Sequence, residues 1–261
     1  MELKKCIGIV SYFPEEQDKR TQRIARFESL LVKINNLWPY LDILIVAQNW
    51  KDYSPVKIQN KLIIYNYNEP LTIVGARNTL RQKFLDETDY DYIIFLDDDA
   101  KINDCQQEVA NQYLDEIDNH PNMFCFIHDK DHWHKCDDYI RAPLNLCAIS
   151  RFIYEKEPIP PVYLEKNEAL EDDTYAVLLH LKYPEYEFIP PVGIKCEHAA
   201  NGIYYFLQLS GKGTPSTWFT RRSNFMQICH NTNIIIDYIF KNKDFNKEEI
   251  IKDKLWNNLW K

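Results

Sequence analysis

Three consecutive aspartates, Asp97, Asp98 and Asp99, follow an apolar run in the segment YIIFLDDDAKI. Packing like charges together costs about 1 kcal/mol for a pair at 4 Å even in bulk water, so a neighbouring positive charge is expected. Carboxylate oxygens with positions left for water and phosphate suit Mg²⁺ or Mn²⁺. In an extended chain Asp97 and Asp99 share one face and Asp98 points elsewhere. The triplet therefore predicts a divalent metal site that holds a diphosphate, with a solvated acidic turn as the alternative.

A second acidic cluster, formed by Glu171, Asp172 and Asp173, opens a segment with a helical apolar pattern. Carboxylates at a helix N-terminus are stabilised by the helix dipole and can accept hydrogen bonds from its free N–H groups. This local role would explain the cluster without any chemistry.

Short β-branched runs alternate with segments whose apolar residues recur on one helical face. Predicted strands cover residues 4–12, 41–48, 61–67, 91–97, 123–128, 142–150 and 186–190. Predicted helices cover the segment from Ile24 to Trp38, residues 72–87, 103–119 and 167–183, and a short stretch after residue 150. This alternation indicates an α/β sheet with helices on both faces. Ligands of such sheets gather outside the carboxyl ends of the strands, where the aspartate triplet falls.

The amino-acid composition of the chain argues against several classes of protein. The chain has 261 residues, 45% of them hydrophobic, which suffices for one substantial core. A formal net charge of -8 argues against nucleic acid as the main partner. The seven cysteines include no C-x-x-C pair and fit a reducing cytosol. No stretch approaches the roughly 18 apolar residues that span a bilayer, so we expect a cytoplasmic protein without a transmembrane segment.

The order of these motifs resembles the GT-A glycosyltransferases, most closely the family-2-like members that use nucleotide sugars. The segments that carry the resemblance are IGIVSYF, LIVAQNW, GARNTL, FLDDDAKI and EALEDDTYAVLLHLKY. The resemblance implies a Rossmann-like GT-A fold with a mixed, mostly parallel sheet and a helical C-terminal extension. It implies an enzyme that moves a sugar from a nucleoside diphosphate sugar, with UDP-sugars favoured, to an acceptor hydroxyl.

The resemblance also implies roles at the donor site. Asp97 corresponds to the first acid of the D-x-D motif, near the ribose or donor sugar, with Asp98 beside it. Arg77 matches a basic residue that contacts the nucleotide, and the alternative is an arginine on the helix surface. Ser11 and Tyr12 fall where such folds receive the base.

One position departs from the family pattern. Similar enzymes place an aspartate at the end of the second strand to bind uracil, whereas this chain has Gln48 followed by Asn49. The resemblance therefore leaves the nucleotide undetermined.

The resemblance implies a metal and a catalytic base. Asp99 would hold the metal together with Asp97 and with His198, which ends the segment YPEYEFIPPVGIKCEH. Imidazole favours Mn²⁺ without excluding Mg²⁺, and a structural histidine is the alternative. Asp172, with Glu171 as second choice, would deprotonate the acceptor hydroxyl, so that a single in-line displacement inverts the sugar.

Three other segments have weaker signals. The segment HDKDHWH, residues 128–134, lacks a zinc spacing, and we interpret it as a polar loop beside the acceptor, with a separate metal site as the alternative. The loop SGKGTPS and the following Arg221 and Arg222 could close over the donor or form a mobile turn. The final EEIIKDKLWNNLWK predicts an amphipathic helix that packs on the domain, or else contacts a membrane surface or a partner.

Two further functions stay open. FLDDDAK also resembles the D-x-D of haloacid-dehalogenase-type phosphatases, although that motif normally lies on the first strand and three strands precede it here. A non-catalytic nucleotide or sugar-binding module is the other.

We expect a glycosyltransferase domain over residues 1–205, with a nucleotide-binding half at 1–100 and an acceptor half at 101–205, and a helical extension over 206–261. A glycan, a lipid-linked acceptor or a protein could receive the sugar.

Overall fold

A computed structural model describes residues 2–120, 124–126 and 146–159. It also describes short strands at 163–164, 167–168, 188–189 and 196–198 and the helical residues Tyr175 and Leu179, which are both buried. The chain divides into two compact units. The first comprises Met1–Asp129, Pro143–Pro158 and Tyr186–Ala199, and the second comprises Lys130–Ala142, Ile159–Glu185 and Ala200–Lys261.

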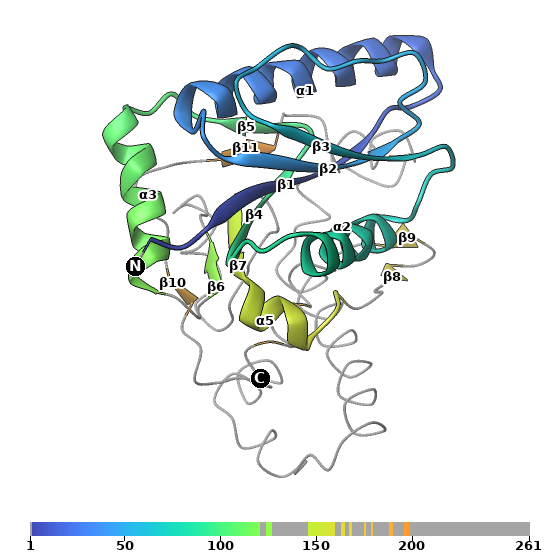
Figure 1. The fold of residues 1–261 in the computed structure, drawn as a ribbon. Coiled ribbons are helices and arrows are strands. Elements are labelled where there is room, and N and C mark those ends of the chain that lie inside the picture. Colours follow the sequence, from blue (N-terminus) through green and yellow to red (C-terminus); the bar gives the residue numbers. More distant parts are fainter. Residues whose placement is uncertain are drawn as a thin grey trace, which may run out of the picture. The chain divides into compact units, whose positions relative to one another are not determined.

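A seven-stranded sheet forms the centre of the first unit, with the strand order β10-β6-β7-β4-β1-β2-β3 (Figure 1). The strands are β1 (Lys5–Tyr12), β2 (Asp42–Gln48), β3 (Leu62–Tyr67), β4 (Tyr92–Asp97), β6 (Phe124–Phe126), β7 (Cys147–Ser150) and β10 (Phe188–Ile189). Strands β1 to β4 are parallel, and β6 is parallel to β10. Only β7 runs against its neighbours β4 and β6. The predicted mixed, mostly parallel sheet is confirmed.

Four helices of the first unit cover the two faces of this sheet (Figure 1). They are α1 (Gln17–Leu37), α2 (Ile73–Glu87), α3 (Gln107–Asn119) and α5 (Arg151–Lys156). Because successive side chains of a strand point to opposite faces, Ile94 and Leu96 of β4 join the core with α1 and α3. Phe95 points the other way and lies edge-on to Tyr154 of α5, with ring centroids 5.7 Å apart.

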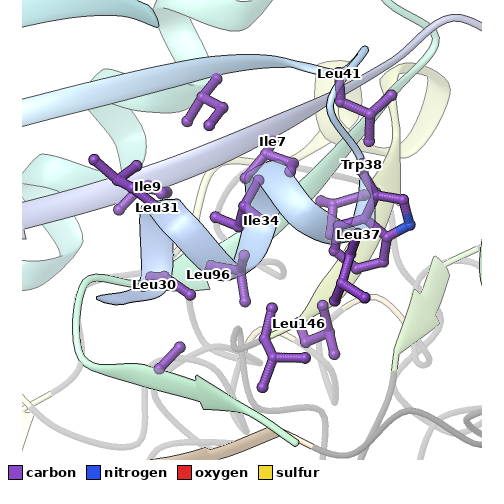
Figure 2. Close-up of a cluster of buried hydrophobic side chains, with 14 of the residues drawn as sticks. Ile7, Ile9, Leu30, Leu31, Ile34, Leu37, Trp38, Leu41, Leu96 and Leu146 are labelled. Carbon is purple, nitrogen blue, oxygen red and sulfur yellow. The ribbon is translucent and has the colours of Figure 1, made fainter. Parts of the chain in front are cut away.

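Helix α1 forms because its apolar residues recur on one face. Phe27, Leu30, Leu31, Ile34 and Leu37 are buried against the sheet. Figure 2 shows Ile34 near Ile7 of β1 and Leu96 of β4, and Leu37 nearer Trp38 and Leu146. The helix ends before Trp38 and Pro39, since proline cannot continue it.

Helix α2 approaches the other face closely at Gly8 of β1. A Cβ at Gly8 would lie 2.5 Å from Ile93 Cδ1 and 3.0 Å from Leu80 Cδ2, so a larger residue would force Ile93 of β4 and Leu80 of α2 to move. The helix begins as predicted, because the Thr72 hydroxyl accepts a hydrogen bond of 3.0 Å from the Gly75 N–H.

Two small strand pairs were not predicted. Strand β5 (Ala100–Ile102) directly follows the aspartates and pairs antiparallel with β11 (Cys196–His198). Strand β8 (Tyr163–Leu164) pairs antiparallel with β9 (Asn167–Glu168). The predicted start of a helix at residue 167 is therefore wrong, because that residue pairs in a hairpin. The helical residues Tyr175 and Leu179 lie within the predicted range.

Other boundaries also differ from prediction. Helix α1 starts at Gln17 rather than at Ile24, helix α3 starts at Gln107 rather than at residue 103, and β7 starts at Cys147. In the portion of the chain that the structure describes, we find no helix with the length and apolarity to cross a bilayer.

Candidate functional site

The candidate site lies at the carboxyl ends of β1 and β4. Strand β1 has β2 on one side and β4 on the other, so the chain moves outward through β2 and β3 and then returns across β1 to form β4. Ligands of open α/β sheets bind at such a reversal of strand order. Val10 of β1 is opposite Asp97 of β4, which brings the predicted residues Ser11 and Tyr12 beside the aspartate triplet.

The aspartates do not alternate as an extended chain would. Asp97 ends β4, but Asp98 and Asp99 form a turn before β5. The expectation that Asp98 points away from the site is wrong for this reason. Its side chain is 2% exposed, and its Oδ2 accepts a hydrogen bond of 3.1 Å from the Tyr12 N–H. The Ser11 side chain also hydrogen-bonds to Asp98, so this carboxylate fastens the turn to the end of β1.

Arg23 of α1 bridges the two aspartates of the turn and was not predicted. Its Nη2 forms an ion pair with Asp98 Oδ1, and its Nη1 lies 2.7 Å from Asp99 Oδ2. Arg23 precedes the buried Phe27 by one helical turn, so it extends the apolar face of α1 toward the site. A charged residue in line with that face was the sequence signal that could have identified it.

Arg77 of α2 is paired with the first aspartate. Its Nη2 lies 3.1 Å from Asp97 Oδ1, and its side chain is 4% exposed. The alternative of an arginine on the helix surface is therefore wrong. Contact with a nucleotide stays a prediction for this residue.

Burial and charge have opposite effects in this cluster. Burial raises the pKa of Asp98 to about 6, although Arg23 and the Ser11 hydroxyl lower it. Burial disfavours the charge of Arg23, but Asp98, Asp99 and Asp97 together raise its pKa above the usual value. Two guanidinium groups thus offset three carboxylates within the protein itself, which is the role that the sequence suggested for a metal.

Gln48 and Asn49 of the β2 end are held inside the protein. Gln48 is 3% exposed, and its Oε1 accepts a hydrogen bond of 2.7 Å from the Leu71 N–H. Asn49 has a φ of 56° and donates from Nδ2 to the Phe13 carbonyl over 2.8 Å. Tyr12, by contrast, is 39% exposed at the end of β1.

Comparison with solved structures decides the fold. The crystal structure of S. aureus TarS 1-349 matches 99% of this chain and 71% of that chain, with a TM-score of 0.52 and 11% identity. The chain has a GT-A-like glycosyltransferase fold. No family model matches it, and no curated protein matches its sequence.

Two other matches have lower TM-scores. A protein described as a nucleotide-diphospho-sugar transferase of Desulfovibrio desulfuricans G20 covers 90% of this chain and 97% of that chain, with 12% identity and a TM-score of 0.43. GalNAc-T7, crystallised with UDP, GalNAc and Mn²⁺, matches 75% of this chain over 44% of its own chain, with 10% identity and a TM-score of 0.43. The fold assignment therefore rests on the TarS match.

The pairing of β11 with β5 brings the backbone of His198 next to the acidic turn. Strand β11 pairs His198 with Ala100, the residue that follows Asp99. Across the residues that were described, no three histidine, cysteine or acidic side chains gather as a metal site. The ligand role of His198 stays a prediction.

The remaining predicted segments lie outside the described residues. They include the candidate bases Glu171 and Asp172, the segment at 128–134, the loop at 210–216 with Arg221 and Arg222, and the C-terminal segment.

Proposed function

We propose that this chain is a glycosyltransferase that moves a sugar from a nucleoside diphosphate sugar, with UDP-sugars favoured, to an acceptor hydroxyl. The observation that carries the proposal is the acidic turn after β4, which lies beside the end of β1 where the strand order of a GT-A-like sheet reverses. A fold hosts many functions, so the side chains at this edge are what support the chemistry.

Three side chains would contact the donor. Tyr12 is exposed and could stack on the base, while Arg77 and Asp97 form a pair at the edge of the site. Ser11 and Asp98 are buried and hydrogen-bonded within the protein, so they would hold the strand ends in place around the donor.

Gln48 would take part in selecting the base. Its carbonyl oxygen already accepts the Leu71 N–H, and the amide lacks the negative charge of the aspartate found in similar enzymes. A charged acceptor for the uracil N–H is therefore missing at this position. The preference for UDP thus depends on the resemblance of the other motifs to the family and not on Gln48.

Asp99, Asp97 and His198 would hold a divalent metal. Carboxylate oxygen and imidazole nitrogen are donors that Mn²⁺ accepts readily and Mg²⁺ accepts less well. Asp97 ends β4, Asp99 lies in the turn, and β11 pairs the backbone of His198 with Ala100, which supports a shared role of these three residues. A bound metal would stabilise the negative charge of the departing diphosphate.

Asp172, with Glu171 as second choice, would accept the proton of the acceptor hydroxyl. A carboxylate does this when it is within hydrogen-bond reach of the nucleophile. A base on the side opposite the leaving nucleotide gives a single displacement with inversion. The resemblance of the E-D pair to the family motif supports this role, and the acceptor would be a glycan, a lipid-linked acceptor or a protein.

The proposal is tested by turnover with a panel of UDP-, GDP- and other nucleotide sugars. We expect at least one donor to release its nucleoside diphosphate, faster with MnCl₂ than with EDTA, and Asp172→Asn to slow transfer to an acceptor. Hydrolysis of a generic phosphoester without any response to nucleotide sugars would instead support a phosphohydrolase. Donor binding without turnover would support a non-catalytic module.

A further inference from the structure

Arg23 is paired with Asp99, the carboxylate that is proposed to bind a metal ion. Its guanidinium spans two carboxylates, with Nη2 on Asp98 and Nη1 2.7 Å from Asp99 Oδ2. The side chains of Asp98 and Asp99 are 2% and 6% exposed, whereas that of Arg23 is 29% exposed. Arg23 is thus the more exposed partner in both ion pairs.

The two ion pairs of Arg23 have different surroundings. Asp98 also receives the Tyr12 N–H and the Ser11 hydroxyl, so its position is fixed by the end of β1. Asp99 is the predicted metal ligand, and its Oδ2 is taken by the guanidinium. Arg23 Nε is buried and finds no hydrogen-bond partner, so the guanidinium is held by its two terminal nitrogens. Arg23 could therefore release Asp99 and stay paired with Asp98.

We propose that Arg23 is the resident counter-ion of Asp99 and that it competes with a divalent cation for this carboxylate. This inference rests on the proposed function. A guanidinium and a metal ion repel each other at such short range, and both are attracted to the Asp99 carboxylate. The apo site therefore binds metal weakly, and the metal enters together with a donor whose diphosphate adds negative charge.

The test is the affinity of the full chain for MnCl₂ without any nucleotide, measured from the signal of free Mn²⁺ in electron paramagnetic resonance. Removing the competing charge with Arg23→Gln should tighten Mn²⁺ binding on the order of tenfold or more. Arg23→Lys keeps the charge and should bind Mn²⁺ like the wild type. Arg23→Gln combined with Asp99→Asn should lose the gain.

A matched control comes from the same helix. Arg26 lies one turn further along α1 and, over the described residues, forms no ion pair with the three aspartates. Arg26→Gln changes the net charge equally and should leave Mn²⁺ affinity unchanged. If Arg23→Gln does not fold, Arg23→Gln with Asp98→Asn removes both charges of the buried pair and should still bind Mn²⁺ more tightly than Asp98→Asn alone.

Equal or weaker Mn²⁺ binding by folded Arg23→Gln would overturn the inference, since it would show that Arg23 does not compete with Mn²⁺ in the wild type. Failure of all these proteins to bind Mn²⁺ would overturn it as well and would remove the metal from the proposed function. Glycosyl transfer measured in EDTA would separate that outcome from a failure of the proposed function itself.

Discussion

Asp98 and Asp99 are neighbours in the chain, but their carboxylates serve different purposes. Asp98 accepts a hydrogen bond from the backbone of β1 and forms an ion pair with Arg23 of α1, so it joins β1 and α1 to the turn after β4. Asp99 is paired with Arg23 and adjoins β5. Asp98 therefore has a structural role, and the chemistry is proposed for Asp99.

Substitution of the two acids should separate these roles. We expect Asp98→Ala to lower the free energy of unfolding by about 3 kcal/mol, since it removes one of the two carboxylates paired with the partly buried Arg23 and leaves the Tyr12 N–H without its acceptor. Asp99→Asn keeps the shape and should cost about 1 kcal/mol or less, but should abolish metal-stimulated transfer. Urea denaturation and the transfer assay measure the two effects. Metal-stimulated transfer by Asp99→Asn would reject the metal assignment.

At the scale of elements, arginines hold the C-terminal ends of two helices. Arg151 of α5 donates to the carbonyls of Phe84, Leu85 and Thr88 at the end of α2, over distances of 2.8 to 3.1 Å. Arg81 of α2 donates in turn to the carbonyls of Tyr154 and Glu155. The last carbonyls of a helix lack intrahelical partners, so these contacts fix α2 against α5.

Arg151→Ala should therefore destabilise the protein. We expect the free energy of unfolding to fall by about 2 to 4 kcal/mol, because several partly buried carbonyls lose charge-assisted hydrogen bonds. Arg26→Ala on α1 is the control and should change stability by about 0.5 kcal/mol or less. Chemical denaturation of both variants measures the difference. Equal stability of the two variants would show that water replaces the arginine without cost.

At the scale of the whole molecule, donor binding should stabilise the folded chain. A ligand that binds only the native state contributes about 2.7 kcal/mol at 100 times its dissociation constant. We expect the matching nucleoside diphosphate with MnCl₂ to raise the melting temperature more than either component alone, since both would meet at the acidic turn.

Two variants locate this response. Asp99→Asn should lose the part of the shift that depends on MnCl₂. Asp104 is fully exposed and pairs with Lys33 over 2.7 Å, so Asp104→Asn removes an equal charge nearby and should retain the full shift. A metal-dependent shift that persists in Asp99→Asn would place the ion elsewhere.

Local features of this protein follow from the order of its amino acids. Strands β1 to β4 and helix α2 lie within about two residues of their predicted bounds, because apolar periodicity and the Thr72 cap act over a few residues. The aspartate triplet was predicted at a strand end, which follows from the same local pattern. Hairpin β8–β9 was missed because two-residue strands carry no periodic signal.

The tertiary structure alone decided which residues meet. Arg23 and Asp99 are 76 positions apart, and Ala100 and His198 are paired across a still longer separation. Nothing in the local sequence fixes such contacts, since they arise from the crossing of α1 over the sheet and from pairing between distant strands. The local sequence thus did not predict Arg23 as a partner of the acidic turn, because only the packed core brings α1 to that edge.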